Sequence, residues 1–190
     1  MAKITPSFIR EVFDASSEIV SQSVLEGSFD TLANEVTTRH RKDNPIAVCV
    51  MNGGLFITSE IVKRLRFPLQ VDYIHASRYR NEYTGSQTLN WVKTPNIDPR
   101  GRTVILFDDI LDGGLTLAEV KRYYEDRGAA KVLTAVMLDK DAPREKGGLI
   151  QADYAGLKVE NKFLFGFGLD YHGYLRNVPA IHAVDEKHMI

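Results

Sequence analysis

Short apolar runs alternate along this chain with segments whose apolar residues recur at helical spacing. The candidate strands are residues 46–51, 103–107 and 131–138, with a weaker one at 69–75. The candidate helices are residues 30–40, the stretch after Gly54, and residues 116–127. Continuous runs rich in β-branched residues are typical of parallel strands that are buried on both faces. The alternation therefore predicts an α/β fold, with a parallel sheet and helices on both of its faces.

The rest of the chain holds one further helix signal and one polar segment. Thr5 and Pro6 are typical of a helix start, and apolar residues recur from Phe8 to Val20, which predicts a single helix there. Residues 77–100 are rich in polar residues, Gly and Pro. Such a segment indicates either a mobile functional loop or a solvated hairpin. The length of 190 residues suits one domain.

Charge and hydropathy argue against several classes of protein. The net charge is −1 with acidic and basic residues interspersed, so the basic surface that nucleic acid requires is not expected. No apolar stretch approaches the roughly 20 residues of a membrane helix, and the first residues lack a signal-peptide pattern. The single cysteine, Cys49, lies in an apolar run and is expected to be a buried thiol. We therefore expect a cytoplasmic protein that binds neither nucleic acid nor membranes.

Three carboxylates follow directly on the apolar run 103–107. They belong to Asp108, Asp109 and Asp112. In parallel sheets, ligands bind beyond the carboxyl ends of the strands. Neighbouring like charges repel each other and are costly to desolvate, so sugar hydroxyls, a divalent metal, a lysine or an arginine should compensate them.

Gly113 and Gly114 come next, at the start of the helix near Thr116. Their N–H groups can form an anion-binding nest, and the positive end of the helix suits a phosphate. Carboxylates for a sugar beside amides for its phosphate predict a ribose-phosphate pocket. The alternative is a solvated acidic turn whose glycines serve the backbone alone.

The segment 104–117, VILFDDILDGGLTL, resembles the signature with which the phosphoribosyltransferase family binds phosphoribosyl pyrophosphate (PRPP). Other segments resemble the hypoxanthine-guanine branch of that family, at residues 48–54, 77–79, 137–140, and 162–171 with 176–177. The resemblance implies a single domain with a type I phosphoribosyltransferase core. The parts expected are a core at about residues 31–160, a flexible catalytic loop from Ser77 to about Gly101, and a small hood built from residues 1–30 and 161–190.

The family's reaction displaces pyrophosphate from ribose C1 with a purine nitrogen, through a transition state with oxocarbenium character. The resemblance implies that Asp108 and Asp109 hold the ribose hydroxyls, directly or through Mg²⁺, and favour the cationic sugar. It implies that Asp112 is the general base near purine N7. The implied contacts to the 5-phosphate are the hydroxyl of Thr116 and the backbone amides of Gly113, Gly114, Leu115 and Thr116.

The implied purine contacts lie later in the chain. Lys140 would donate to O6 of a 6-oxopurine, where adenine carries an amino group. Phe163 would stack on the base, and Leu164 would offer main-chain groups to its edge. Asp170 is placed with these contacts and would hold a Mg²⁺ bound to pyrophosphate. The alternatives are a surface lysine, a core phenylalanine and, for Asp170, a structural ion pair with Arg176.

The implied pyrophosphate contacts come from two turns and an arginine. They are Asn52, Gly53, Ser77, Arg78, Tyr79 and Arg176. Two positions depart from the usual family pattern: Asn52 stands where many members have Lys or Arg, and Gly113 stands where many have Thr or Ser. PRPP binding is therefore expected to be weaker or differently arranged, with activity retained.

Purine salvage is the function that the resemblance implies. The chain would transfer the 5-phosphoribosyl group of PRPP to hypoxanthine, guanine or both, giving IMP or GMP and pyrophosphate. The alternatives are a xanthine-preferring phosphoribosyltransferase and a non-catalytic regulator that senses PRPP. Members of the family are commonly dimers or tetramers, so a homodimer or homotetramer is expected.

Overall fold

The computed structural model describes residues 4–80 and 87–189; for residues 77–80 and 87–89 it describes the backbone alone. The helices are α1 (Pro6–Ala15), α2 (Gln22–His40), α3 (Leu55–Val62) and α4 (Leu115–Glu125), with a short 3₁₀ helix at Glu186–His188. The strands are β1 (Ser17–Val20), β2 (Ile46–Met51), β3 (Gln70–Arg80), β4 (Gln87–Lys93), β5 (Thr103–Leu111), β6 (Lys131–Asp141), β7 (Tyr154–Glu160), β8 (Leu164–Phe165) and β9 (Ile181–Ala183).

A six-stranded sheet in the order β4-β3-β2-β5-β6-β7 forms the centre of the molecule. Strands β3, β2, β5, β6 and β7 run parallel, and β4 is an antiparallel edge strand. β5 lies between β2 and β6, so its carboxyl end is central in the sheet. This arrangement confirms the predicted α/β fold.

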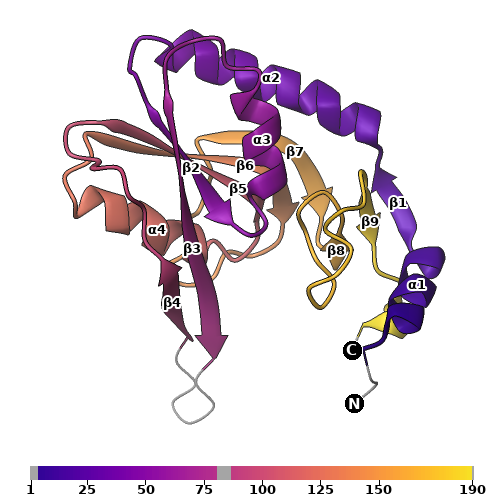
Figure 1. Cartoon of the computed structure of the whole chain (residues 1–190). Helices are drawn as coiled ribbons and strands as arrows, with labels where there is room; N and C mark the ends of the chain where they lie inside the picture. The colour runs from indigo at the N-terminus through magenta and orange to yellow at the C-terminus, as the bar shows by residue number, and fades with distance from the viewer. Residues whose placement is uncertain (1–3, 81–86, 190) are drawn as a thin grey trace.

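Alternate residues of β5 point to opposite faces of the sheet, as the pleat requires. Ile105 and Phe107 belong to the core beneath α2 and α3, whereas Val104 and Leu106 belong to the core beneath α4. Figure 1 shows α2 and α3 together, apart from α4. Burying each such side chain contributes about 1.5–3 kcal/mol. Because both faces of β5 are buried, its sequence is continuously apolar up to Phe107.

A second sheet, β1-β9-β8, is built from segments near the two ends of the chain. α1 packs on it through Ile9 and Val12, which share a core with Phe165. This sheet is the small hood that the resemblance implied. The single helix predicted from Phe8 to Val20 is wrong in its second half, because Ser17–Val20 pairs with β9 instead.

The polar segment after His75 begins as a hairpin. β3 continues to Arg80 and pairs antiparallel with β4, with Ser77 opposite Asn90. The buried carboxylate of Asp72 accepts hydrogen bonds from the N–H groups of Asn96 and Ile97, both at 2.7 Å. The sequence predicted either a mobile loop or a hairpin for residues 77–100. The described backbone on either side of residues 81–86 is that of a hairpin.

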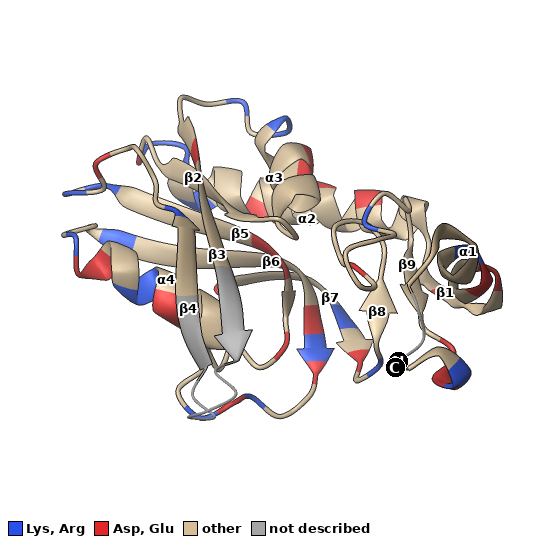
Figure 2. Ribbon diagram, turned by 60° about the horizontal axis from the view of Figure 1, so that its bottom comes forward, with Lys and Arg blue, Asp and Glu red and all other residues tan. Residues whose placement is uncertain are grey.

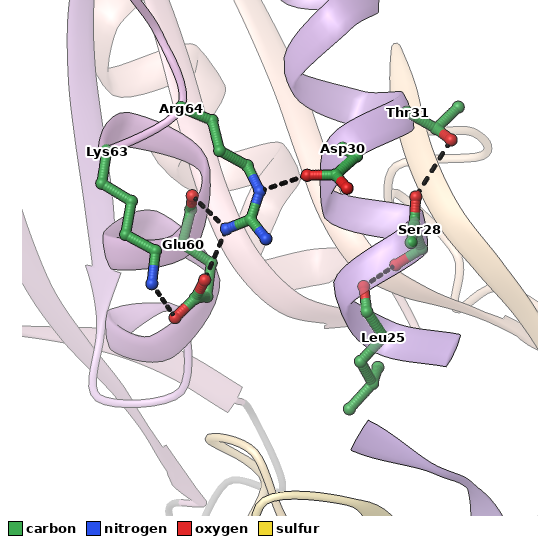
Figure 3. A network of polar contacts seen from close by, with 8 residues as sticks. Leu25, Ser28, Asp30, Thr31, Glu60, Lys63 and Arg64 are labelled. Atoms are coloured by element: carbon green, nitrogen blue, oxygen red, sulfur yellow. Dashed lines mark hydrogen bonds and ion pairs between the residues drawn. The ribbon is translucent and has the colours of Figure 1, made fainter. Parts of the chain in front are cut away.

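Helices α2 and α3 are joined by a polar network around Arg64 (Figure 3). Arg64 Nε donates to Asp30 Oδ1 at 2.7 Å, and its Nη1 donates to Glu60 Oε2 at 2.5 Å. The Arg64–Asp30 pair, in which the side chain of Asp30 is 67% exposed, contributes about 0–1 kcal/mol. It links the carboxyl end of α3 to α2, while the other end of α3 begins at the site described next.

Candidate active site

A cavity of about 480 Å³ lies beyond the carboxyl end of β5. It is lined by residues from five parts of the chain, among them Met51 and Gly53, Asp108 to Ile110, Asp112 to Leu117, Pro143 and Glu145, and Asp170 and Arg176. Figure 2 shows acidic and basic residues at the ends of the neighbouring strands β6 and β7. The turn at Gly53, the acidic end of β5 and the C-terminal residues Asp170 and Arg176 lie far apart in the sequence, and they meet in one cavity.

Asp108 and Asp109 form the acidic floor of this cavity, where both are half-buried. Burial raises the pKa of Asp109 to about 6. Burial, and then the charge of Asp109, raise the pKa of Asp108 well above its ordinary value. The pair is therefore costly to ionise, and a cation or a set of hydroxyl donors would stabilise the ionised form.

The turn after β2 packs directly against this acidic pair. A Cβ atom on Gly53 would lie 1.9 Å from Oδ2 of Asp109, and one on Gly54 would lie 2.4 Å from the carbonyl oxygen of Phe107. Only glycine allows so close an approach at these two positions. Asn52 lies in the same turn but does not line the cavity.

The glycine turn at the start of α4 packs against the segment that follows β6. Gly114 has φ of 80°, in the left-handed region that favours glycine. A Cβ atom on Gly113 would lie 2.4 Å from Oε1 of Glu145. The space that a threonine or serine side chain would fill at position 113 is therefore taken by Glu145. Sequence reasoning missed Glu145, because nothing in the sequence links it to Gly113.

Lys140, near the end of β6, reaches the turn from the other side. Its Nζ lies 3.0 Å from Oδ2 of Asp112. Lys140 does not line the main cavity; it lines an adjoining groove with Asp139 and Arg144. The structure thus brings Lys140 and Asp112 together, and Lys140 is not a solvated surface lysine, since its side chain is only 13% exposed.

Arg144 is a second residue that sequence reasoning missed. Its Nη1 donates to the carbonyl oxygens of Leu111, Asp112 and Lys140 at 2.8–2.9 Å. Its Nη2 pairs with the carboxylate of Asp139. Arg144 therefore ties the Asp112 turn to the end of β6.

Phe163 and Leu164 lie at the start of the hood sheet and do not line the cavity. Phe163 is 47% exposed, with its ring edge-on to Tyr171 at 5.9 Å between centroids. Phe165 is fully buried. The alternative that Phe163 is a core residue is therefore wrong. Leu164 is buried in β8.

Asp170 and Arg176 face each other across the cavity wall. Arg176 Nη2 lies 2.6 Å from Oδ1 of Asp170, and the N–H of Gly173 donates to Oδ2 at 2.6 Å. Arg176 also donates to the carbonyl oxygen of Gly168. The ion pair considered from the sequence is present, and both of its members line the cavity.

Ser77, Arg78 and Tyr79 belong to β3, where they pair with Asn90, Leu89 and Thr88. Their side chains lie outside the described residues. Ala76, one residue earlier, lines the cavity. The β3–β4 hairpin therefore begins at the edge of the site.

The carboxylates of the cavity fit a hard divalent cation only in part. Within residues 4–80 and 87–189, no three His, Cys, Asp or Glu side chains converge on one point. Asp108, Asp109 and Asp170 offer oxygen donors, and the remaining ligands of a Mg²⁺ would be substrate oxygens and water, as is usual for this ion.

None of the described helices is both long and apolar enough to span a membrane.

The sequence and the structure both match known proteins. Residues 16–172 match the family model for the phosphoribosyl transferase domain. A hypoxanthine-guanine-xanthine phosphoribosyltransferase of Tritrichomonas foetus is 32% identical over 92% of this chain and 94% of its own length. A hypoxanthine-guanine phosphoribosyltransferase of Streptococcus pneumoniae is 30% identical over 92% of this chain and 96% of its own length.

Among solved structures, a hypoxanthine-guanine-xanthine phosphoribosyltransferase superposes with a TM-score of 0.80 at 29% identity. The match covers 90% of this chain and 97% of the other. The chain therefore belongs to the phosphoribosyltransferase family, together with these hypoxanthine-guanine enzymes.

Proposed function

We propose that this chain transfers the 5-phosphoribosyl group of PRPP to hypoxanthine, guanine or both, in purine salvage. The products are IMP or GMP and pyrophosphate. The observation that carries this proposal is the cavity in which the pair Asp108 and Asp109 meets the glycine turn at the start of α4. Carboxylates suit the hydroxyls of ribose, and the amides at a helix N-terminus suit its phosphate.

The carboxylates and the helix amides of the cavity are assigned to different parts of PRPP. Asp108 and Asp109 bind the ribose hydroxyls, and their charge favours the cationic sugar of the transition state. The amides of residues 113–116 and the hydroxyl of Thr116 bind the 5-phosphate. Asp112 accepts the proton at purine N7. Its 3.0 Å contact with Lys140, the residue that we assign to the base, supports this role.

The residues that we assign to pyrophosphate are Asn52, Gly53, Ser77, Arg78, Tyr79 and Arg176. Of these, Gly53 and Arg176 line the same cavity. Asp108, Asp109 and Asp170 are the residues assigned to Mg²⁺, which when bound neutralises charge on the leaving pyrophosphate. Closure of the hairpin from Ser77 to about Gly101 would exclude water, which otherwise hydrolyses the activated sugar.

The purine is assigned to the space between the end of β6 and the hood. Lys140 donates to O6, Phe163 stacks on the ring, and the main chain of Leu164 contacts the base edge. Support comes from Phe163, because its exposed aromatic ring is available for stacking. A second candidate activity is the use of xanthine as well, because the relative from Tritrichomonas foetus is named for all three bases.

We further propose one domain across residues 1–190, with a core at about 31–160 and a hood from 1–30 and 161–190. The cytoplasm is the proposed location, since the buried Cys49 thiol is unpaired.

The chain is proposed to form a homodimer or homotetramer. An apolar groove of about 580 Å³ over β2, β3 and α3, bordered by the exposed Leu55, Val71 and Tyr73, supports this. Sedimentation of the wild type and of Val71→Glu measures the oligomeric state.

The experiment that tests the activity offers four bases separately. The purified chain is incubated with PRPP, Mg²⁺ and hypoxanthine, guanine, xanthine or adenine, and pyrophosphate and nucleotide are measured together. Turnover with hypoxanthine or guanine and little with adenine is expected. Turnover chiefly with adenine would refute the role of Lys140. Binding of PRPP without turnover of any base would favour a regulator.

A further inference from the structure

Residues 142–149, which we name the strap, cross over the glycine turn that starts α4. Two backbone hydrogen bonds fix it there: the N–H of Glu145 donates to the carbonyl of Gly113, and the N–H of Leu149 donates to that of Gly114, both at 2.9 Å. A Cβ atom on Gly148 would lie 2.1 Å from the carbonyl oxygen of Gly113. The strap and the turn are therefore in direct backbone contact.

Arg144 anchors the strap from within. Its side chain is only 14% exposed, and its guanidinium holds the carbonyl oxygens of Asp112 and Lys140. The position of the next residue, Glu145, is therefore set by the same contacts that shape the Asp112 turn.

The side chain of Glu145 projects over the turn into the cavity. A Cβ atom on Gly113 would meet its Oε1 at 2.4 Å and its Cγ at 2.9 Å. Within the described part of the chain, its carboxylate has no hydrogen-bond or ion-pair partner. A negative charge thus stands at the turn to which we assign the 5-phosphate, and glycine at position 113 makes room for it.

From this geometry we infer that Glu145 weakens the binding of the 5-phosphate and so sets the affinity of the chain for PRPP. The inference rests on the proposed function, which assigns the 5-phosphate to residues 113–116. Two unit charges about 4 Å apart interact by about 1 kcal/mol in water, which corresponds to roughly fivefold in a binding constant. The nucleotide product carries the same phosphate, so its binding is weakened as well and its release is favoured.

The test compares Glu145→Gln, which removes the charge at constant size, with Glu125→Gln, an exposed position at the far end of α4. The KM for PRPP and the dissociation constants of IMP and ribose 5-phosphate are measured. In Glu145→Gln all three are expected to fall about two- to tenfold, and by less at high salt. The KM for hypoxanthine should not change, and Glu125→Gln should match the wild type. Unchanged or weaker binding of PRPP and ribose 5-phosphate by Glu145→Gln would overturn the inference.

A double-mutant cycle gives a second, independent measure. Gly113→Thr alone should raise the KM for PRPP, because its side chain collides with Glu145. Adding Glu145→Ala should lower the KM for PRPP by a larger factor in Gly113→Thr than in the wild type, so the two changes should not be additive. Additive effects would contradict the proposed contact.

The outcomes separate this inference from the proposed function. Turnover of hypoxanthine with an unchanged KM for PRPP in Glu145→Gln would overturn the inference alone. Tighter ribose 5-phosphate binding by the variant, with no turnover by either protein, would overturn the activity alone. If neither protein binds ribose 5-phosphate, the turn is not a phosphate site and both fail.

Discussion

Lys140 and Asp112 form an ion pair, with 3.0 Å between Nζ and Oδ2, that links the end of β6 to the turn after β5. Lys140 is largely covered, whereas the carboxylate side chain of Asp112 is 52% exposed. The residue assigned to purine O6 and the residue assigned to N7 are therefore in contact without a purine present. Because O6 and N7 are neighbours on a purine ring, one base can reach both groups at once.

Lys140→Gln should reduce the preference for 6-oxopurines. The ammonium donates to O6 and loses that bond to adenine, a difference that can reach about 10⁴ in discrimination. The ratio of kcat/KM for hypoxanthine to that for adenine should fall by at least about tenfold. Lys146→Gln, at an exposed position in the strap, is the control. An unchanged ratio would remove Lys140 from base recognition.

Asp112→Asn should slow the chemical step. Loss of a general base typically costs about 10²–10⁴ in rate, and the amide oxygen of asparagine can still accept from Lys140. We expect kcat to fall in that range while the dissociation constant of PRPP changes little. Asp126→Asn, on the exposed end of α4, serves as the control. A kcat near that of the wild type would show that another group takes the proton.

The same substitution at two glycines should act in opposite directions. In Gly53→Ala the new Cβ would meet Asp109 Oδ2 at 1.9 Å, so the turn or the carboxylate must move. We expect a raised KM for PRPP and a loss of about 1–3 kcal/mol in unfolding free energy. In Gly27→Ala the new Cβ, within α2, meets nothing within 4 Å, and about 0.5–1 kcal/mol of stability should be gained. Denaturant unfolding of both variants checks the contrast, and a destabilised Gly27→Ala or an unaffected Gly53→Ala would contradict it.

The hood should lose stability in mild acid through His182. Burial lowers the pKa of His182 below its ordinary 6.5, and Glu18 opposes this shift. Nδ1 lies 2.9 Å from Ser16 Oγ, and the ring stacks on Phe165. The unfolded chain takes up the proton more readily than the folded one. The contribution of His182 to the free energy of unfolding is therefore complete above pH 6.5 and is lost as the pH falls through the lowered pKa of His182.

His182→Gln should therefore flatten the pH dependence of stability. The free energy of unfolding, measured from pH 8 to pH 5, should fall more steeply for the wild type than for the variant. Parallel profiles would show that His182 does not titrate with folding.

The large sheet could be predicted because its central strands are buried on both faces, which makes their sequences continuously apolar. β7 was missed, because its residues Tyr154–Glu160 mix exposed and buried positions and include two charged side chains, Lys158 and Glu160. Ile19 and Val20 fit a helical stripe, but pairing with β9 overrode that local preference. Such pairing between distant segments leaves no local pattern.

The candidate site was predictable where its residues adjoin a strand end. Asp108 and Asp109 lie near the carboxyl end of β5 and Asp112 directly follows it, so the sheet alone brings them to one edge. Arg144 and Glu145 could not be predicted as site residues, because the turn that they contact, at Asp112 and Gly113, lies 32 residues earlier in the chain. Both look like ordinary surface charges in the sequence.

A structure of the chain with PRPP and Mg²⁺ would locate the substrate. We expect the 5-phosphate at the amides of residues 113–116, with the ribose hydroxyls within hydrogen-bond reach of Asp108 and Asp109. PRPP bound outside this cavity, or bound with its pyrophosphate at the turn of Gly113 and Gly114, would refute the proposed PRPP site.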